Sequence, residues 1–262
     1  MRMIIATWNV NGFRARATRL REWLAERKPD VVCLQELKVK EEEFSHEHLE
    51  TAGYRAAIVG QQGWNGVAVI AREKPEIVLR ELPGAPANSG ARYVTARVHG
   101  MEVASAYIPN GKTTAHPEFK TKLAWLERLA VHIEGTLDKH APFVLAGDFN
   151  VCWTDLDSHL GSRGHGAIFH TDEERALLDR LKAAGLVDLY RSLHEDDPGY
   201  SWWDYRAGAF HRKLGMRLDL LLGTAPVAKR VKEVFVDREF RKKSKTSGAI
   251  PSDHAPVVAR LD

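Results

Sequence analysis

Cysteine is scarce in this sequence, with only two residues, Cys33 and Cys152, in a chain of 262. Two cysteines are too few for a disulfide framework, and neither has the CxxC spacing or the neighbouring histidines of a structural zinc site. Cys33 lies inside an apolar run, and Cys152 closely follows Asn150. We therefore expect two buried, reduced thiols.

Long apolar segments are absent as well. The longest uninterrupted apolar runs have about half a dozen residues, whereas a helix that spans a bilayer needs about 20. The amino terminus shows no charged region followed by an apolar one, which is the pattern of a secretory signal. These features predict a cytoplasmic protein without membrane contact.

Segments that would divide the chain are also missing. There is no linker rich in Pro, Gly or Ser, no low-complexity tract and no repeat with a period of about 20 to 50 residues. No GxGxxG follows a strand and no GxxxxGK[ST] occurs, which argues against the common nucleotide-binding folds. With 44% apolar residues the chain can bury a sizeable core. We expect one domain, residues 1–262, that acts as a monomer.

The net charge of +3 is modest and does not by itself indicate a nucleic-acid partner. Lys and Arg nevertheless gather at residues 206–217 and 238–245. The first cluster mixes cations with aromatic side chains, a combination that contacts phosphates and bases, so we favour a binding function there. For the second cluster we favour a solvated loop. The first cluster contains Arg206, Arg212, Lys213 and Arg217, with Trp202, Trp203, Tyr205 and Phe210 interleaved.

Hydrophobic periodicity predicts helices at 16–28, at 117–139 and at 171–185, the last opening with a capping box. Short apolar runs rich in β-branched residues alternate with these helices. Residues 67–71 and 94–98 look like antiparallel neighbours, joined by short polar segments. The class is therefore α/β or α+β, with mixed sheets and helices outside.

Six of the apolar runs end in, or surround, a polar residue that can bind a metal ion or move a proton. Strand ends that share one edge of a sheet bring such residues together although they are distant in sequence. We therefore predict one assembled active site. Its candidates are Asn9, Glu36, Tyr107, Asp148 with Asn150, Asp219, and Asp253 with His254.

Three of these candidates are carboxylates, Glu36, Asp148 and Asp253. An ionised carboxylate beside an apolar run is costly unless it is paired or binds a cation. Together with the amide oxygens of Asn9 and Asn150 they form an oxygen-only set, which suits Mg²⁺, with Mn²⁺ as a substitute. Mg²⁺ is commonly completed by a substrate phosphate, so the set indicates phosphoryl transfer or phosphodiester hydrolysis.

Two further candidates bear on proton transfer and charge. Asp219 is the carboxylate we expect to hold the imidazole of His254 in one tautomer, so that the ring orients a water or stabilises charge on the phosphorus. Tyr107 has two interpretations, ordinary packing at a strand end or a hydrogen bond from its phenol to a phosphate.

Eight short motifs in this order resemble those of the exonuclease III family of DNA repair nucleases, and the resemblance spans residues 3–261. It implies the endonuclease/exonuclease/phosphatase fold, a four-layer α-β-β-α sandwich with two mixed β-sheets. It also implies Mg²⁺-dependent hydrolysis of double-stranded DNA 5′ to abasic sites, and removal of nucleotides or blocking phosphates from damaged 3′ ends. The motifs are WNVNG (8–12), LQELK (34–38), NGVA (65–68), YIPNG (107–111), GDFN (147–150), WDYR (203–206), RLD (217–219) and SDHAP (252–256).

The resemblance also implies roles for single residues. Glu36 looks like the main metal carboxylate, with Asn9 and Asp253 close to it, and Asp148 looks like the proton-transfer residue, with Asn150 as its partner. Asp219 and His254 resemble the family's orienting dyad, and Tyr107 its phosphate-side phenol. The positions that match DNA-backbone contacts are Arg92, Asn110, Lys122 and Arg217, and those that match the pocket for an extruded abasic sugar are Trp202, Trp203, Met216 and Leu218.

Two departures from the family pattern affect the grip on DNA rather than the catalytic groups. Trp153 stands where many relatives have proline, and residues 247–250 interrupt a basic segment where some relatives keep a cation. Two alternatives remain open, a relative acting on a small phosphoester and a catalytically inactive nucleic-acid-binding protein. The aromatic and basic residues 202–217 count against the first, and the complete set of catalytic candidates counts against the second.

Overall fold

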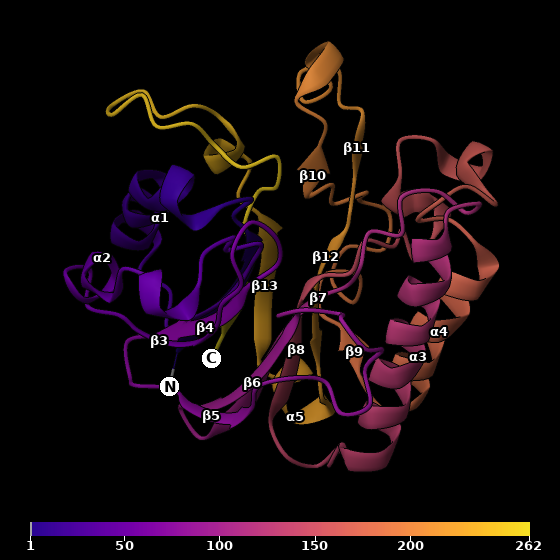
Figure 1. Cartoon of the computed structure of the whole chain (residues 1–262), viewed down its shortest axis with the longest axis horizontal. Coiled ribbons are helices and arrows are strands. Elements are labelled where there is room, and N and C mark those ends of the chain that lie inside the picture. Colours follow the sequence, from indigo (N-terminus) through magenta and orange to yellow (C-terminus); the bar gives the residue numbers. More distant parts are fainter. Residues whose placement is uncertain (1) are drawn as a thin grey trace.

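The computed structural model describes residues 2–262. Within them the strands form two six-stranded sheets and a two-stranded ribbon, β10-β11 (Figure 1). Sheet A has the order β13-β14-β1-β2-β4-β3, and sheet B has the order β5-β6-β7-β8-β12-β9. Both sheets mix parallel and antiparallel pairs.

The strands are β1 (Met3–Asn9), β2 (Val31–Gln35), β3 (Arg55–Val59), β4 (Val67–Ala71), β5 (Glu76–Leu79), β6 (Tyr93–Val98), β7 (Met101–Tyr107), β8 (Phe143–Asp148), β9 (Val187–Asp188), β10 (Trp202–Trp203), β11 (Gly215–Met216), β12 (Asp219–Gly223), β13 (Val231–Val236) and β14 (Val257–Leu261). The α-helices are α1 (Phe13–Arg27), α2 (His46–Glu50), α3 (Pro117–Thr136), α4 (Asp172–Ala183) and α5 (Ala225–Ala228). Short 3-10 turns are η1 (Glu41–Glu43), η2 (Asp155–Asp157), η3 (Gly161–Gly164), η4 (Arg206–Gly208) and η5 (Arg238–Arg241).

Helix α1 covers the outer face of sheet A. Its buried Leu20 and Trp23 belong to one apolar cluster with Trp8 of β1, and the two indole rings meet edge to face at 5.7 Å. The helix begins three residues before the predicted start at residue 16. It ends one residue before the predicted end, because Lys28 turns left-handed at φ 50° ahead of Pro29.

Helices α3 and α4 cover the outer face of sheet B (Figure 1). Trp125 of α3 and Leu178 of α4 pack in one cluster with Leu145 of β8. The predicted capping box at the start of α4 is present, with Thr171 as the N-cap residue. Helix α3 ends at residue 136 and not at the predicted 139, because Leu137 is extended.

The inner faces of the two sheets pack directly on each other. Alternate residues of each strand, such as Ile5 and Cys33 in sheet A and Val103 and Val144 in sheet B, form one buried cluster. Adding the helices outside gives the four-layer α-β-β-α sandwich that the sequence predicts. Both cysteines are buried and free, also as predicted.

One predicted strand pair is wrong. Strands β4 and β6 are not neighbours, because β4 pairs with β2 and β3 in sheet A, whereas β6 pairs with β5 and β7 in sheet B. Val69 and Ala96 lie in the same inter-sheet cluster, so the two strands meet face to face. Side chains alternate with a period of two whether two strands pair in one sheet or face each other from two sheets. The sequence pattern therefore does not distinguish these arrangements. No helix among residues 2–262 is long and apolar enough to cross a membrane.

Candidate active site

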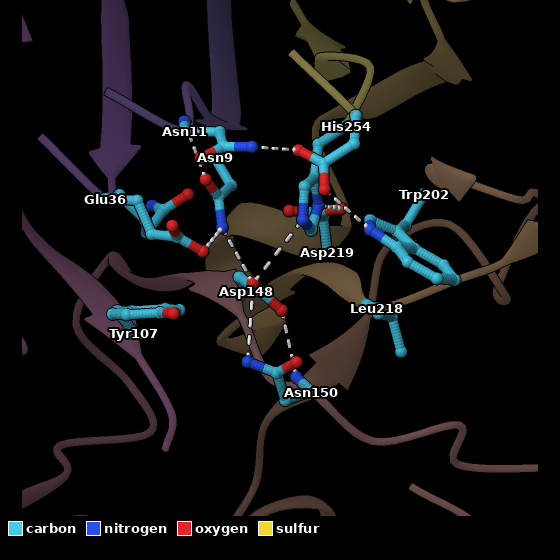
Figure 2. A network of polar contacts seen from close by, with 12 residues as sticks. Asn9, Asn11, Glu36, Tyr107, Asp148, Asn150, Trp202, Leu218, Asp219 and His254 are labelled. Carbon is cyan, nitrogen blue, oxygen red and sulfur yellow. Dashed lines mark hydrogen bonds and ion pairs between the residues drawn. The ribbon is translucent and has the colours of Figure 1, made fainter. Parts of the chain in front are cut away.

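The predicted polar residues converge at one edge of the sandwich (Figure 2). In sheet A, Asn9 ends β1 beside the end of β2, which Glu36 follows. In sheet B, Asp148 is the register partner of both Tyr107 and Asp219. Strand pairing therefore aligns the functional groups of two neighbouring strands in sheet A, β1 and β2, and of three in sheet B, β7, β8 and β12.

The backbone around these residues departs from ordinary strand geometry. Gly147, just before Asp148, has φ 155°, and a Cβ there would lie 1.8 Å from the carbonyl oxygen of Ala106, so only glycine fits. Glu36 and Asn150 adopt φ 53° and φ 50°, a conformation that non-glycine residues rarely adopt. Such strain is common where side chains are held for chemistry.

Asn9 joins the two carboxylates nearest to it. Its Nδ2 donates to Oε1 of Glu36 and to Oδ2 of Asp148, both at 2.9 Å. The ammonium of Lys38 lies 2.8 Å from the other oxygen of Glu36. Burial would raise the pKa of Glu36, but Lys38 and Asn9 outweigh burial and lower it. Glu36 is therefore ionised at neutral pH.

His254 and Asp219 form the predicted dyad. The Nδ1 of His254 lies 2.8 Å from Oδ2 of Asp219, and its Nε2 faces Oδ2 of Asp148 at 3.7 Å. All three side chains are buried. A bond from Nδ1 to a carboxylate orients the ring and directs Nε2 toward Asp148.

Burial and neighbouring charges act on the pKa values of Asp148 and His254, and the net effect raises both. Burial raises the pKa of Asp148, and the charges of Asp219 and Glu36 add to this effect although His254 opposes it. Burial alone would lower the pKa of His254, but the carboxylates of Asp219 and Asp148 outweigh it and raise the pKa. A carboxyl group that accepts a proton readily thus lies beside an imidazole that keeps its charge.

Asp253 is held at both oxygens. Oδ1 accepts a hydrogen bond of 2.8 Å from the amide of Asn11, and Oδ2 accepts one of 3.0 Å from the indole of Trp202. The guanidinium of Arg241 binds its backbone carbonyl at 3.0 Å. The carboxylate therefore has a defined orientation at the edge of the site.

Asn150 is fixed by its neighbours on three sides. Its backbone N–H donates to Oδ1 of Asp148 at 3.0 Å, its Nδ2 donates to the carbonyl of Ile108 at 3.0 Å, and Lys122 donates to its carbonyl at 2.6 Å. Its side-chain oxygen accepts a bond of 3.3 Å from Asn110. Asn150 is thereby locked beside the carboxylate of Asp148.

Tyr107 is partly buried beside Arg92, whose guanidinium lies 4.6 Å from the phenol ring centre. Burial raises the pKa of Tyr107 well above its usual value, and the carboxylates of Glu36 and Asp148 raise it further. The phenol is therefore a hydrogen-bond donor throughout the physiological range. This suits it to contact an anionic oxygen.

An apolar cluster flanks the carboxylates. Met216 and Leu218 are buried with Cys152, and Trp202 packs against them from the β10-β11 ribbon. Trp203 is not part of this cluster, although it was predicted to line the same pocket. It is 1% exposed and packs behind the ribbon with other apolar residues, because successive residues of a strand point to opposite faces.

Two predicted DNA contacts lie inside the protein. Lys122 is fully buried against Glu174, and Arg217 is 2% exposed, with its guanidinium 2.7 Å from Asp157 and 2.8 Å from Asp188. As they stand, both cations stabilise the loops that carry site residues and present no charge to a ligand. Their acidic partners lie far away in sequence, so no local pattern announced the pairing.

The other predicted contacts remain at the surface. Asn110, Arg206 and Lys213 are exposed, and Arg92 is partly exposed beside Tyr107. Arg206 is paired with Asp204 at 2.7 Å. Asn110, Arg206 and Lys213 are therefore accessible to a ligand in solution.

Asn11 and Lys38 are site residues that the sequence reasoning did not assign. Lys38 donates to Oδ1 of Asn11 at 2.6 Å while it pairs with Glu36. Both belong to the quoted motifs, and both have positive φ, 48° and 55°. Each lies two positions after a predicted site residue at a strand end, Asn11 after Asn9 and Lys38 after Glu36. This spacing is the sequence feature that could have identified them.

The residues present fit a divalent cation. The ligand oxygens of Asp148 and Asp219 lie within 4.8 Å of each other, and Oδ1 of Asp219 is buried without a hydrogen-bond partner among the described residues. The carboxylates of Glu36 and Asp253 add oriented hard oxygens at the same edge. A cation would satisfy charge that the described protein groups leave uncompensated.

The chain is similar to known proteins in both sequence and structure. Residues 6–254 match the model of the endonuclease/exonuclease/phosphatase family. The chain is 32% identical to exodeoxyribonuclease III of Haemophilus influenzae, covering 99% of this chain and 100% of the relative. A 3′ phosphatase from Neisseria bound to a product DNA hairpin is 36% identical with a TM-score of 0.94, covering 99% of both chains. An AP endonuclease from Archaeoglobus fulgidus is 34% identical with a TM-score of 0.93, again covering 99% of both.

Proposed function

Because the chain belongs to the endonuclease/exonuclease/phosphatase family, we propose that it is a DNA repair phosphodiesterase of the exonuclease III type. It cleaves DNA 5′ to abasic sites and removes nucleotides or blocking phosphates from 3′ ends. The relatives support this range of activities, since their names include an exodeoxyribonuclease, a 3′ phosphatase and an AP endonuclease, each similar over nearly the whole chain.

The observation that carries the proposal is the buried group of Asp219, His254 and Asp148, with Asn150 fixed at its side. Phosphodiester hydrolysis needs a group to accept a proton from water and a positive group to balance charge on the phosphorus. Asp148 and His254 meet these needs. Their shifted pKa values fit the roles.

We assign the following steps to these residues. Asp148 accepts a proton as a water oxygen bonds to phosphorus, and the bond between phosphorus and the 3′ oxygen then breaks, with that oxygen taking up a proton. The imidazolium of His254, oriented by Asp219, donates a hydrogen bond to a non-bridging phosphate oxygen. Tyr107 and the amide of Asn150 donate to the same group and hold it in line.

The family depends on a divalent metal, and we propose Mg²⁺, with Mn²⁺ as a substitute. Glu36 and Asp253 would hold it, with Asn9, Asp148 and Asn150 adjacent, and it would neutralise phosphate charge during the reaction. The hard oxygen donors of this set support Mg²⁺ over zinc.

We further propose double-stranded DNA with abasic sites or damaged 3′ ends as the partner of the site. Every group named above comes from one chain, which supports a monomer with one catalytic domain over residues 1–262. This substrate would place the protein in the cytoplasm, associated with the nucleoid if the source is bacterial.

The experiment is a gel assay on three labelled duplexes, one with a central abasic-site analogue, one with a recessed 3′ end and one with a 3′ phosphate. Each is incubated with Mg²⁺ and with EDTA, beside the Asp148→Asn variant. Metal-dependent cleavage that the variant lacks, with its DNA affinity retained, is the expected result. Tight DNA binding without cleavage of any duplex would instead indicate an inactive binding protein.

A further inference from the structure

Trp202 belongs to two features of the site at once. Its ring lies beside Leu218 (Figure 2) and packs with it and Met216 in the apolar cluster. Its indole N–H donates to Oδ2 of Asp253 at 3.0 Å. The backbone strengthens the link, because Trp202 forms a β-bridge with His254. The wall of the apolar cluster is thus tied to the segment that carries two functional side chains.

The hydrogen bonds continue beyond Asp253. Its other oxygen accepts from Nδ2 of Asn11 at 2.8 Å, the side-chain Oδ1 of Asn11 accepts from Lys38 at 2.6 Å, and Lys38 pairs with Glu36 at 2.8 Å. Direct contacts therefore connect Trp202 to Glu36. We call these contacts, from Trp202 through Asp253, Asn11 and Lys38 to Glu36, the relay. The relay links the apolar cluster to both carboxylates proposed to hold the metal.

We propose that Trp202 is a positioning residue for the cation site, in which its indole N–H fixes the carboxylate of Asp253 while its ring stays packed in the apolar cluster. This inference rests on the proposed function, since it takes Asp253 as a metal carboxylate. Groups that hold a metal-binding side chain in place typically change metal affinity about 10- to 100-fold when removed. A nucleotide or base-free sugar against the ring would meet the same side chain that orients the carboxylate.

Trp202→Phe tests the inference because it keeps an aromatic ring and removes the N–H donor, together with the pyrrole part of the indole, a loss of volume that the control variant shares. Trp153→Phe is the matched control. The indole of Trp153 also donates to a carboxylate, that of Asp179, at 2.8 Å, but this pair lies outside the relay. Mn²⁺ affinity is measured by calorimetry without DNA, so the result does not depend on any nuclease activity.

We expect the Mn²⁺ dissociation constant of Trp202→Phe to rise about 10-fold, and that of Trp153→Phe to stay at the wild-type value. Tryptophan emission should change on Mn²⁺ addition in the wild type and in Trp153→Phe, and this change should be lost in Trp202→Phe. Thermal melts confirm that each variant is folded.

Equal Mn²⁺ affinity of Trp202→Phe and the wild type would overturn the inference, as would a wild type without saturable Mn²⁺ binding. A wild type that binds Mn²⁺ with the expected Trp202 dependence yet cleaves no DNA would retain the inference and refute the proposed function. The two failures are therefore distinguishable.

Discussion

Replacing Asp219 by Asn probes the His254 dyad with almost no change of shape. The carboxylate is buried and lies 2.8 Å from Nδ1 of His254, so the substitution removes a charge-assisted hydrogen bond from the interior. Hydrogen bonds to charged groups contribute about 1.5–3 kcal/mol. At about 1.36 kcal/mol for each tenfold change in rate, kcat should fall roughly 10- to 150-fold if His254 acts as the imidazolium.

The same substitution should change the pH dependence. In the wild type the carboxylates of Asp219 and Asp148 outweigh the burial that lowers the pKa of His254, and raise it, so the ring keeps its charge as the pH increases. Without Asp219 the raising effect weakens and burial gains influence. The alkaline limb of the kcat profile should therefore move to lower pH.

The assay is single-turnover cleavage of an abasic duplex at saturating Mg²⁺. It covers about pH 6 to 10, a range that begins near the ordinary pKa of an imidazole. Asp179→Asn, an exposed aspartate remote from the dyad, is the matched control. A variant whose rate stays within about threefold of the wild type and whose profile keeps its position would refute the role given to Asp219.

Three further predictions concern metal, acid stability and salt. Glu36→Ala should raise the Mg²⁺ concentration for half-maximal activity about 10-fold or more, and an unchanged titration would remove Glu36 from the metal site. Asp157→Asn should lower the free energy of unfolding by about 1.5–3 kcal/mol, because it removes a charge-assisted hydrogen bond from buried Arg217, which keeps Asp188 as a partner. Burial would raise the pKa of Asp157, but Arg217 lowers it below 3.8, so this stabilisation is present above that value and lost as pH falls through the lowered pKa. Melts at neutral and acid pH should show the gap between wild type and variant closing, and a constant gap would contradict this. Lys243 and Lys245 are exposed on the loop before Ser252, which we expect to be solvated. Changing both to Gln should therefore leave the slope of log affinity against log salt unchanged, whereas a slope reduced by about 2 would show that both cations contact DNA phosphates.

Local patterns in the sequence were sufficient for much of the fold and for the catalytic candidates. The capping box at Thr171 and the apolar spacing of α3 are set by neighbours a few residues away, so they can be predicted without tertiary contacts. The same holds for a polar residue that ends a buried run, such as Asp148, because an ionised carboxylate there is costly unless it is paired or binds a cation. The order of the motifs then indicated the family.

Tertiary structure decided which polar groups face a ligand and which face the core. Lys122 and Arg217 read as surface cations in the sequence, yet they are buried against carboxylates between 29 and 60 residues away, as the pairs with Asp188 and Asp157 show for Arg217. Similarly, pairing with strands distant in sequence decides that β4 belongs to sheet A and β6 to sheet B. Trp202 and Trp203 are adjacent and chemically identical, but alternation along β10 brings only the indole of Trp202 to the carboxylate of Asp253. Distant partners, which no local pattern encodes, determine these outcomes, because burial of a charge or a ring is settled only when the elements pack.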